Sequence, residues 1–320
     1  MFAALAPRSA SVHSIRFIPM DSSSSSSSPS SPFPEIEQLW NYNRPADTEQ
    51  RFRKLLPQVE AAGNESYRLE LLTQIARCEG LQRRFADAHD TLDIVAPLLA
   101  DAPARPRLRY LLERGRVFNS SGTPAEARPL FVQAWEEGNA AGEDDLAVDA
   151  AHMVAIVEKP EEALAWNEKA YQLAEQSNHP TARRWIGSLT NNIGWTWHTL
   201  GDYDQALRYF QRNVEWHNQM GSGEGLMIAQ WCVARTLRSL GRVEEALAMQ
   251  QQVQRERAER GFAADGYVFE ELGECLLALD RKEEAREYFA GAYELLSEDS
   301  WMQANEGARL QRLQQLGEGK

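Results

Sequence analysis

Three features of this 320-residue sequence predict an all-α fold built from stacked pairs of helices. From about residue 67, one pattern returns six times: a helical run of apolar residues, a short break, and a second helical run marked by an alanine. These alanines recur at intervals from 36 residues (Ala127 to Ala163) to 43 residues (Ala163 to Ala206), a period typical of stacked helical pairs. The chain also has only 20 glycines and 14 prolines, which suits a mostly helical protein.

Composition excludes several partner classes. Hydrophobic residues make up 43% and charged residues 25% of the chain, as in ordinary globular proteins. The formal net charge of −13 disfavours long-range attraction to nucleic acid or anionic lipid. No apolar run approaches the roughly 18 residues that a membrane span needs. We therefore expect a soluble, cytoplasmic protein with neither a nucleic-acid nor a membrane partner.

Residues 1–33 are predicted to be a disordered tail. The first twenty residues contain Arg8 and Arg16 but no acidic residue, which loosely resembles an organelle transit peptide. A start at Met20, or a plain disordered tail, explains the same composition. A serine run, Ser22 to Ser28, and several prolines follow, and such a segment cannot bury enough apolar surface to offset its ordering entropy. Organelle import therefore stays open as an alternative to the cytoplasm.

The remaining chain, 34–320, is predicted to form a single solenoid whose two ends are covered. After a short turn near Glu35–Trp40, an amphipathic helix at about 47–62 is expected to cap the N-terminal end. Six repeats occupy about 67–295, and a helix at about 300–316 caps the C-terminal end with a polar outer face. Counting the short turn, we expect about fourteen helices.

Small residues mark the crossing of the two helices within a copy. In the clearest copies a glycine of the first helix is followed by the alanine and then, four residues later, by a phenylalanine: Gly115–Ala127–Phe131, Gly194–Ala206–Phe210 and Gly273–Ala285–Phe289. Glycine and alanine leave no bulk where two backbones cross closely. The aromatic ring is expected to fill the gap to the neighbouring pair.

This pattern resembles the tetratricopeptide repeat family over roughly residues 67–295. Two copies match closely, whereas Ala76 and Ala151 stand where the family prefers glycine, and Gln250 replaces the large apolar residue. Spacings longer than about 34 residues resemble the extended-helix versions of the family. The resemblance implies a right-handed superhelix whose first helices line a concave groove.

In that family the exposed positions of the first helices contact ligands. Here they carry arginines, amides, tryptophans and histidines: Arg77, Arg109, Arg116, His152, Asn191, Asn192, Trp195, His198, Trp231, Arg235 and Arg238. Arginine forks match carboxylates bidentately, asparagines can clasp an extended backbone, and tryptophans provide anchoring surface. The groove is therefore interpreted as a binding site for an acidic peptide segment or a chain terminus. The family's lysine-and-asparagine carboxylate clamp is not reproduced.

A structural explanation of these arginines stays open. They can instead pair with acidic neighbours such as Glu70, Glu113 or Asp149 and hold the superhelix open. Glu113 precedes Arg116 by three residues, a spacing that places two side chains on one face of a helix.

The sequence predicts no catalytic, cofactor or metal site. It contains no phosphate loop, nucleophile elbow or His-Glu-x-x-His motif, and neither its six histidines nor its three cysteines have metal-ligand spacing. The leading prediction is a non-catalytic protein–protein interaction scaffold. The alternative is a regulatory or sensory module that encloses a small ligand or signalling peptide around Asn191, Trp195 and Trp231. An enzyme is disfavoured, because the repeats leave no room for a catalytic domain.

Overall fold

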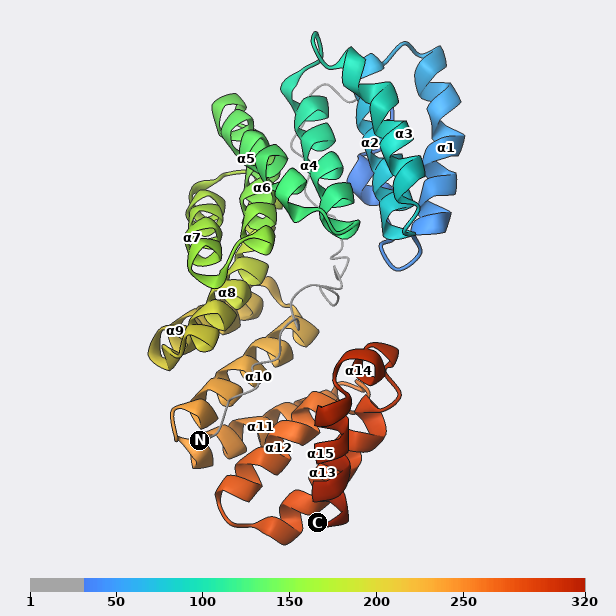
Figure 1. Ribbon diagram of the computed structural model, residues 1–320. Coiled ribbons are helices and arrows are strands. Elements are labelled where there is room, and N and C mark those ends of the chain that lie inside the picture. Colours follow the sequence, from blue (N-terminus) through green and yellow to red (C-terminus); the bar gives the residue numbers. More distant parts are fainter. Residues whose placement is uncertain (1–31, 320) are drawn as a thin grey trace. The chain divides into compact units, whose positions relative to one another are not determined.

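A computed structural model describes residues 32–319, so the predicted tail at residues 1–33 lies almost wholly outside the described residues, as do Arg8, Arg16, Met20 and the serine run. Within the described range the chain forms fifteen α-helices, two short 3₁₀ helices and no strand, which confirms the all-α prediction (Figure 1). Across residues 32–319, no helix combines the length and the apolar character that crossing a membrane requires.

The helices follow one another with short connections. Their bounds are η1 (Ile36–Leu39), α1 (Pro45–Ala61), α2 (Glu65–Leu81), α3 (Phe85–Val95), η2 (Ala96–Leu98), α4 (Ala104–Ser120), α5 (Pro124–Ala141), α6 (Asp144–Val157), α7 (Pro160–Gln176), α8 (Pro180–Leu200), α9 (Tyr203–Met220), α10 (Gly223–Ser239), α11 (Val243–Glu259), α12 (Gly266–Ala278), α13 (Lys282–Leu296), α14 (Ser300–Asn305) and α15 (Gly307–Glu318).

The twelve helices from α2 to α13 form six successive pairs, each made of a first and a second helix. Every second helix carries its marker alanine in the interior, at Ala88, Ala127, Ala163, Ala206, Ala246 and Ala285. An alanine at this point lets two helices approach closely, because its side chain adds little bulk. The marker alanines therefore mark the positions at which helices pack closely, once in each pair.

Glycine and phenylalanine meet inside a pair. A Cβ built on Gly115 would lie 2.4 Å from Cε1 of Phe131, and one built on Gly273 would lie 2.8 Å from Cε1 of Phe289. Each ring therefore packs on the glycine of its own pair, not only toward the neighbouring pair as the sequence suggested. Both rings are buried, so the glycine makes room for the ring.

The other three pairs use a different combination at the same place. Twelve residues before the marker alanine they have alanine, and four residues after it they have a smaller side chain than phenylalanine: Ala76 with Leu92, Ala151 with Asn167, and Ala234 with Gln250. An alanine Cβ occupies space that the ring would need, so the two positions change together. Gln250 is fully buried, and its Oε1 has no hydrogen-bond partner among the described residues.

The chain divides into two compact units, with the boundary between Leu189 and Thr190 inside α8. In the first unit, α1 to α4 lie side by side (blue to teal in Figure 1), over an apolar core that includes Phe52 and Ile75. In the second unit, a continuous core extends from α9 to α15 and includes Phe210 and Phe289.

The C-terminal end differs from the single helix expected at 300–316. The chain bends at Glu306, which separates α14 from α15. The carboxylate of Asp299 accepts hydrogen bonds from the backbone N–H groups of Trp301 and Met302 and so caps α14. Leu310 and Leu313 of α15 are buried against the rest of the unit, so α15 covers the last pair (Figure 1).

Candidate functional site

The side of the first helices α2, α4 and α6 of the first unit that carries the following charged residues is called the first-helix face: Glu70, Arg77, Arg105, Arg109, Glu113, Arg116, Asp145 and Asp149. Arg77 of α2 donates two hydrogen bonds from Nη1 to Glu113 of α4, at 3.1 and 3.2 Å. Arg116 donates to the same carboxylate at 2.7 Å and to Asp149 of α6 at 2.5 Å. Glu113 is only 3% exposed. Two of the predicted arginines are thus already ion-paired to carboxylates of neighbouring first helices.

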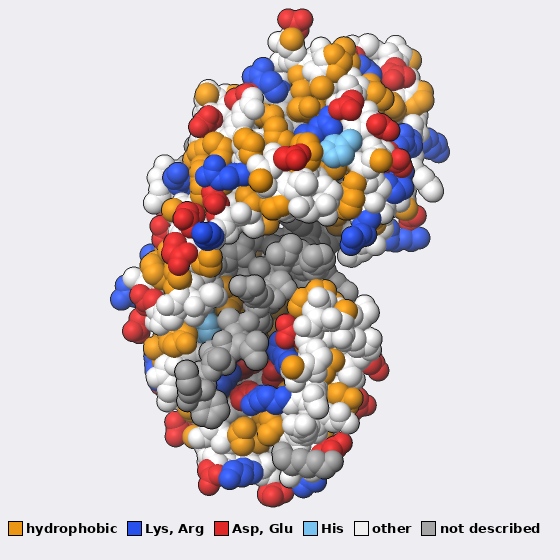
Figure 2. Space-filling view, viewed as in Figure 1, with side chains coloured by type: hydrophobic (Ala, Val, Ile, Leu, Met, Phe, Trp, Pro, Cys, Tyr) orange, Lys and Arg blue, Asp and Glu red, His pale blue; other side chains and the backbone are white. Residues whose placement is uncertain are grey.

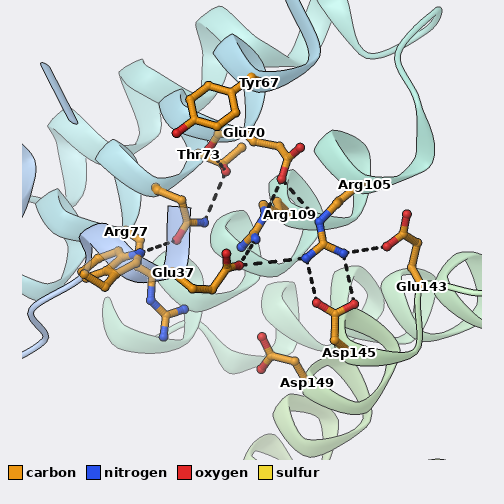
Figure 3. Close-up of polar contacts among 12 residues, drawn as sticks. Glu37, Tyr67, Glu70, Thr73, Arg77, Arg105, Arg109, Glu143, Asp145 and Asp149 are labelled. Atoms are coloured by element: carbon orange, nitrogen blue, oxygen red, sulfur yellow. Dashed lines mark hydrogen bonds and ion pairs between the residues drawn. The ribbon is translucent and has the colours of Figure 1, made fainter. Parts of the chain in front are cut away.

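A second ion-pair network lies on the same face, one to two turns away (Figure 3). Arg109 donates from Nε to Glu70 of α2 at 2.8 Å and from Nη2 to Glu37. Arg105, four residues earlier in α4, donates to Glu143 at 2.6 Å and to both carboxylate oxygens of Asp145, at 3.1 and 2.7 Å.

The electrostatics of this network keep its arginines charged. Burial lowers the pKa of Arg105, but hydrogen bonding to and attraction by Asp145 outweigh burial, so the net pKa is raised. Burial raises the pKa of Glu37, yet the attraction of Arg109 lowers it overall. Burial dominates at Glu70, whose pKa is raised despite both arginines. At neutral pH the guanidinium groups are therefore cations that require carboxylate partners.

A stretch of mostly non-helical chain lies against this face. We call residues Phe33–Asn43 the N-terminal segment. The hydroxyl of Tyr67 on α2 donates to the backbone oxygen of Pro34 at 2.7 Å. Glu37, in the 3₁₀ turn of the segment, receives the hydrogen bond from Arg109, 72 residues away in the chain. The segment therefore reaches the face through its backbone as well as through a carboxylate.

The aromatic residues of the segment contact the same face one turn further along α2. The indole N–H of Trp40 donates to Oε1 of Gln74 at 3.0 Å. The guanidinium of Arg77 stands over the rings of Trp40 and Tyr42, 5.9 and 5.5 Å from their centroids. These two rings stack on each other with centroids 4.5 Å apart. Arg77 is thus both an ion-pair partner and a cation–π donor.

A cavity remains between the segment and the helices. Its volume is about 450 Å³ including its open mouth, and it is lined by Phe33–Glu37 on one side and by Tyr67, Glu70, Arg105 and Arg109 on the other. The segment therefore does not fill the surface on which it lies.

His152 is buried and is not among the charged residues that define the first-helix face. The side chain on α6 is 7% exposed, and its ring centroid lies 5.1 Å from that of Trp185. Burial lowers the pKa of His152, more than the charge of Asp149 raises it. This predicted groove residue lies in the interior, because the neighbouring first helix covers it.

In the second unit the predicted aromatic residues form a row. The ring centroids of Trp195 and Trp231 are 5.9 Å apart, and those of Trp231 and Tyr267 are 6.3 Å apart. The three residues are spaced 36 apart in the sequence, one on each of α8, α10 and α12. The indole N–H of Trp231 donates to the backbone oxygen of Tyr267 at 3.1 Å. Tyr267 belongs to this row but was not among the predicted residues.

Three predicted polar residues of the second unit lie on α8 and α10, two of the helices that carry that row. Arg235 and Arg238 both pair with Glu271, each with Nε 2.8 Å from a carboxylate oxygen. His198 Nε2 lies 3.0 Å from Oγ of Ser239. Burial, together with the charges of Arg235 and Arg238, lowers the pKa of His198 to about 4.

The two predicted asparagines are half-buried on α8. Asn191 accepts a hydrogen bond from the Cys232 thiol at 3.6 Å, and the backbone oxygen of Asn192 accepts one from the Thr196 hydroxyl. Among residues 32–319, no group of three or more His, Cys, Asp or Glu side chains is placed to hold a metal ion.

Comparison with known proteins finds family matches within α4 to α9. A profile described as a tetratricopeptide repeat matches residues 187–217, and a second one matches residues 109–183. The chain carries tetratricopeptide repeats. No curated protein sequence matches it.

Solved structures share the repeat architecture. A signal transduction ATPase with a tetratricopeptide repeat sensor from Pyrococcus horikoshii is 12% identical, with a TM-score of 0.68, over 83% of this chain and 42% of that one. BtubC from P. vanneervenii is 14% identical, with a TM-score of 0.56, over 73% and 95%. A Rap protein complexed with competence and sporulation factor is 15% identical, with a TM-score of 0.52, over 88% and 84%. At these identities the likeness concerns the fold.

Sequence reasoning missed two features of the first-helix face of this tetratricopeptide repeat chain. Arg105 was not predicted, although it precedes Arg109 by four residues and so shares its side of α4. The N-terminal segment was expected only as a short turn, and no local pattern links Glu37 to an arginine 72 residues away. The arrangement offers carboxylate, backbone-carbonyl and aromatic recognition on one surface, which are the contacts that hold an extended peptide.

Proposed function

We propose that this tetratricopeptide repeat chain is a non-catalytic scaffold for a protein or peptide partner, and that the partner places an acidic, extended segment on the first-helix face. The repeats and their relatives support the interaction role. The acidic character of the ligand rests on Arg105, Arg109 and Arg77, three of the cations of this face. Charged side chains of both signs lie beside one another over the surface drawn in Figure 2, so the proposal concerns a local arrangement rather than a large basic region.

One observation carries the proposal: the first-helix face already holds an acidic segment, its own residues Phe33–Asn43, which includes the short 3₁₀ helix η1. Tyr67 binds a backbone carbonyl of that segment, and Arg109 binds the carboxylate of Glu37. A face that recognises the main chain and a carboxylate together has the contacts that a peptide ligand requires.

The ion pairs indicate which carboxylate a ligand can replace. Glu113 and Asp145 are 3% and 5% exposed, so their removal would leave arginines without partners in the interior. The side chain of Glu37, by contrast, remains 47% exposed. A ligand carboxylate therefore takes the place of Glu37 and pairs with Arg109 and Arg105. Arg116, between two carboxylates of the helices, holds the repeats together.

The aromatic row of the second unit supports a second candidate function, the binding of a small ligand or signalling peptide. Trp195, Trp231 and Tyr267 are only partly buried and lie in ring contact, which provides an anchoring surface. Arg235 and Arg238 share one carboxylate, Glu271, so two cations face a single internal anion. The solved Rap protein with competence and sporulation factor shares this fold.

Affinity capture with matched variants tests the leading proposal. The full chain, the variant Arg105→Gln and the control Arg107→Gln are used as baits, and the retained proteins are identified by mass spectrometry. Arg107 lies two residues away on α4 and also pairs with a carboxylate, Glu137 of α5, at 2.6 Å. Arg105 instead belongs to the first-helix face. Circular dichroism melting verifies that all three baits are folded.

The expected result is a partner that the native chain and Arg107→Gln retain and that Arg105→Gln loses. Retention of the same partners by all three baits would refute the first-helix face as the binding site. Loss of the partner by both variants would mean that substitutions in α4 act by destabilising the chain and not by changing this face.

A further inference from the structure

We propose that the N-terminal segment, Phe33–Asn43, is an intramolecular ligand of the first-helix face, and that the partner is a peptide of the same chemistry that binds by displacing it. The partner peptide has an acidic residue at the position of Glu37 and a tryptophan or tyrosine about three residues later, at the position of Trp40. This inference rests on the proposed function, because it names the ligand class and the regulation of the same face.

The contacts of the segment are those of a ligand and not those of a continuous helix. The backbone carbonyl of Pro34, the carboxylate of Glu37 and the indole N–H of Trp40 each meet a side chain of α2 or α4. The residues that meet are 33, 72 and 34 positions apart in the chain. A separate peptide can make all three contacts, since none of them depends on the covalent link to α1.

Only Ile36 of the segment is fully buried, Phe33, Leu39 and Trp40 are partly buried against the same core, and the remaining side chains are mostly exposed. Ile36 is 4% exposed and packs into the core beside Phe52, whereas Tyr42 is 39% exposed. The open cavity beside the segment includes Arg105 and Arg109 in its wall. A competing peptide with larger side chains can fill that space and so gain contacts that the segment lacks.

The covalent link makes the segment a strong competitor. A tethered ligand has an effective concentration on the order of millimolar, so a free peptide of equal intrinsic affinity binds the native chain weakly. Weakening the segment removes this competition and leaves the face intact. The same peptide then binds more tightly, although the face has not changed.

The test uses a fluorescein-labelled peptide with the sequence of residues 32–44 and the full chain. Its binding is measured by fluorescence anisotropy to the native chain, to Glu37→Lys and to the control Glu60→Lys. The change at Glu37 places a cation opposite Arg105 and Arg109 and releases the segment. Glu60 is an exposed residue of α1 outside the segment and the face, and its substitution makes the same change of charge.

The expected result is that Glu37→Lys binds the labelled peptide at least tenfold more tightly than the native chain and Glu60→Lys do. A labelled peptide that itself carries lysine in place of Glu37 is expected to lose this gain. Equal affinity of all three chains would overturn the inference, as would equal binding of the two peptides to Glu37→Lys.

The outcome separates this inference from the proposed function. If affinity capture finds a partner that Arg105→Gln loses while Glu37→Lys shows no gain for the labelled peptide, the face binds its partner and the segment is only a cap. If Glu37→Lys gains affinity while capture shows no dependence on Arg105, the segment is a ligand and the cellular partner binds elsewhere.

Discussion

Phe210 packs so closely on Gly194 that a Cβ added to the glycine would lie 2.6 Å from Cε1 and 2.8 Å from Cδ1 of the ring. We therefore expect Gly194→Ala to destabilise the chain by about 1–3 kcal/mol, the usual cost of overpacking a core. The better helix propensity of alanine, about 1 kcal/mol, offsets part of this cost. Urea denaturation followed by circular dichroism measures the change.

The pair Ala76 and Leu92 supplies the matched control, because it occupies the same two positions in another repeat. The double variant Gly194→Ala, Phe210→Leu is expected to lose less free energy of unfolding than the two single variants lose in total. Additive losses would contradict a direct contact between the two residues.

The turn between α12 and α13 contains a non-glycine residue in the left-handed conformation. Asp280 has a φ of +58°, and Gly201 occupies the equivalent turn position, five residues before the marker alanine, with a φ of +84°. The left-handed conformation costs most non-glycine residues roughly 1–2 kcal/mol, and it costs aspartate less because the short side chain can hydrogen-bond to the nearby backbone. Asp280→Gly is expected to raise the melting temperature, and Gly201→Ala to lower it. An unchanged or lower melting temperature for Asp280→Gly would mean that its exposed contact with Lys282 matters more than the cost of this conformation.

His198 is expected to make stability depend on pH. Its pKa in the folded chain is about 4, lowered from 6.5 by burial and by Arg235 and Arg238. The unfolded chain therefore binds a proton at a higher pH than the folded chain does. The contribution of His198 to the free energy of unfolding is fully present above about pH 6.5 and is lost as the pH falls toward 4. The free energy of unfolding changes by at most about 1.4 kcal/mol per pH unit in this window.

Urea midpoints between pH 7.5 and pH 4.5 measure this effect. The native chain is expected to lose stability more steeply than His198→Gln across that window. The difference between the two slopes is smaller than about 1.4 kcal/mol per pH unit, because the His198 ring is partly exposed. Parallel curves for the two chains would show that His198 is not the titrating group.

The three cysteines are expected to be unreactive in the folded chain. Cys78, Cys232 and Cys275 are free and at most 1% exposed, and burial raises the pKa of each thiol to about 12. A protonated, inaccessible thiol is a poor nucleophile. Ellman's reagent should therefore titrate none of them in native buffer and all three in urea. Rapid reaction of one thiol in native buffer would indicate local opening of its helix pair.

The repeat architecture was predictable because its signal is local and recurs. Ala206 and Phe210 lie on one helix turn, and the spacing between copies follows from the size of a helical pair. The residues of the first-helix face were also partly predictable: Arg77, Arg109 and Arg116 are on it, and the alternative that they pair with Glu70, Glu113 and Asp149 describes their contacts.

Three features were not predictable from local sequence. His152 is interior because α8 packs over it, and the register of two helices is a tertiary property. The ion pair between Glu37 and Arg109 joins residues 72 positions apart. The break at Glu306 lies beside Gly307, and a single glycine lowers helix propensity without fixing whether the helix ends there.

Hydrogen exchange of the full chain tests most directly that the first-helix face holds an acidic, displaceable segment. The native chain is incubated with a saturating, isotope-labelled copy of the peptide of residues 32–44, and exchange is followed by mass spectrometry. We predict faster exchange of the chain's own amides at residues 33–43, with α2 and α4 still protected. Unchanged exchange at residues 33–43 in the presence of bound peptide would contradict this account.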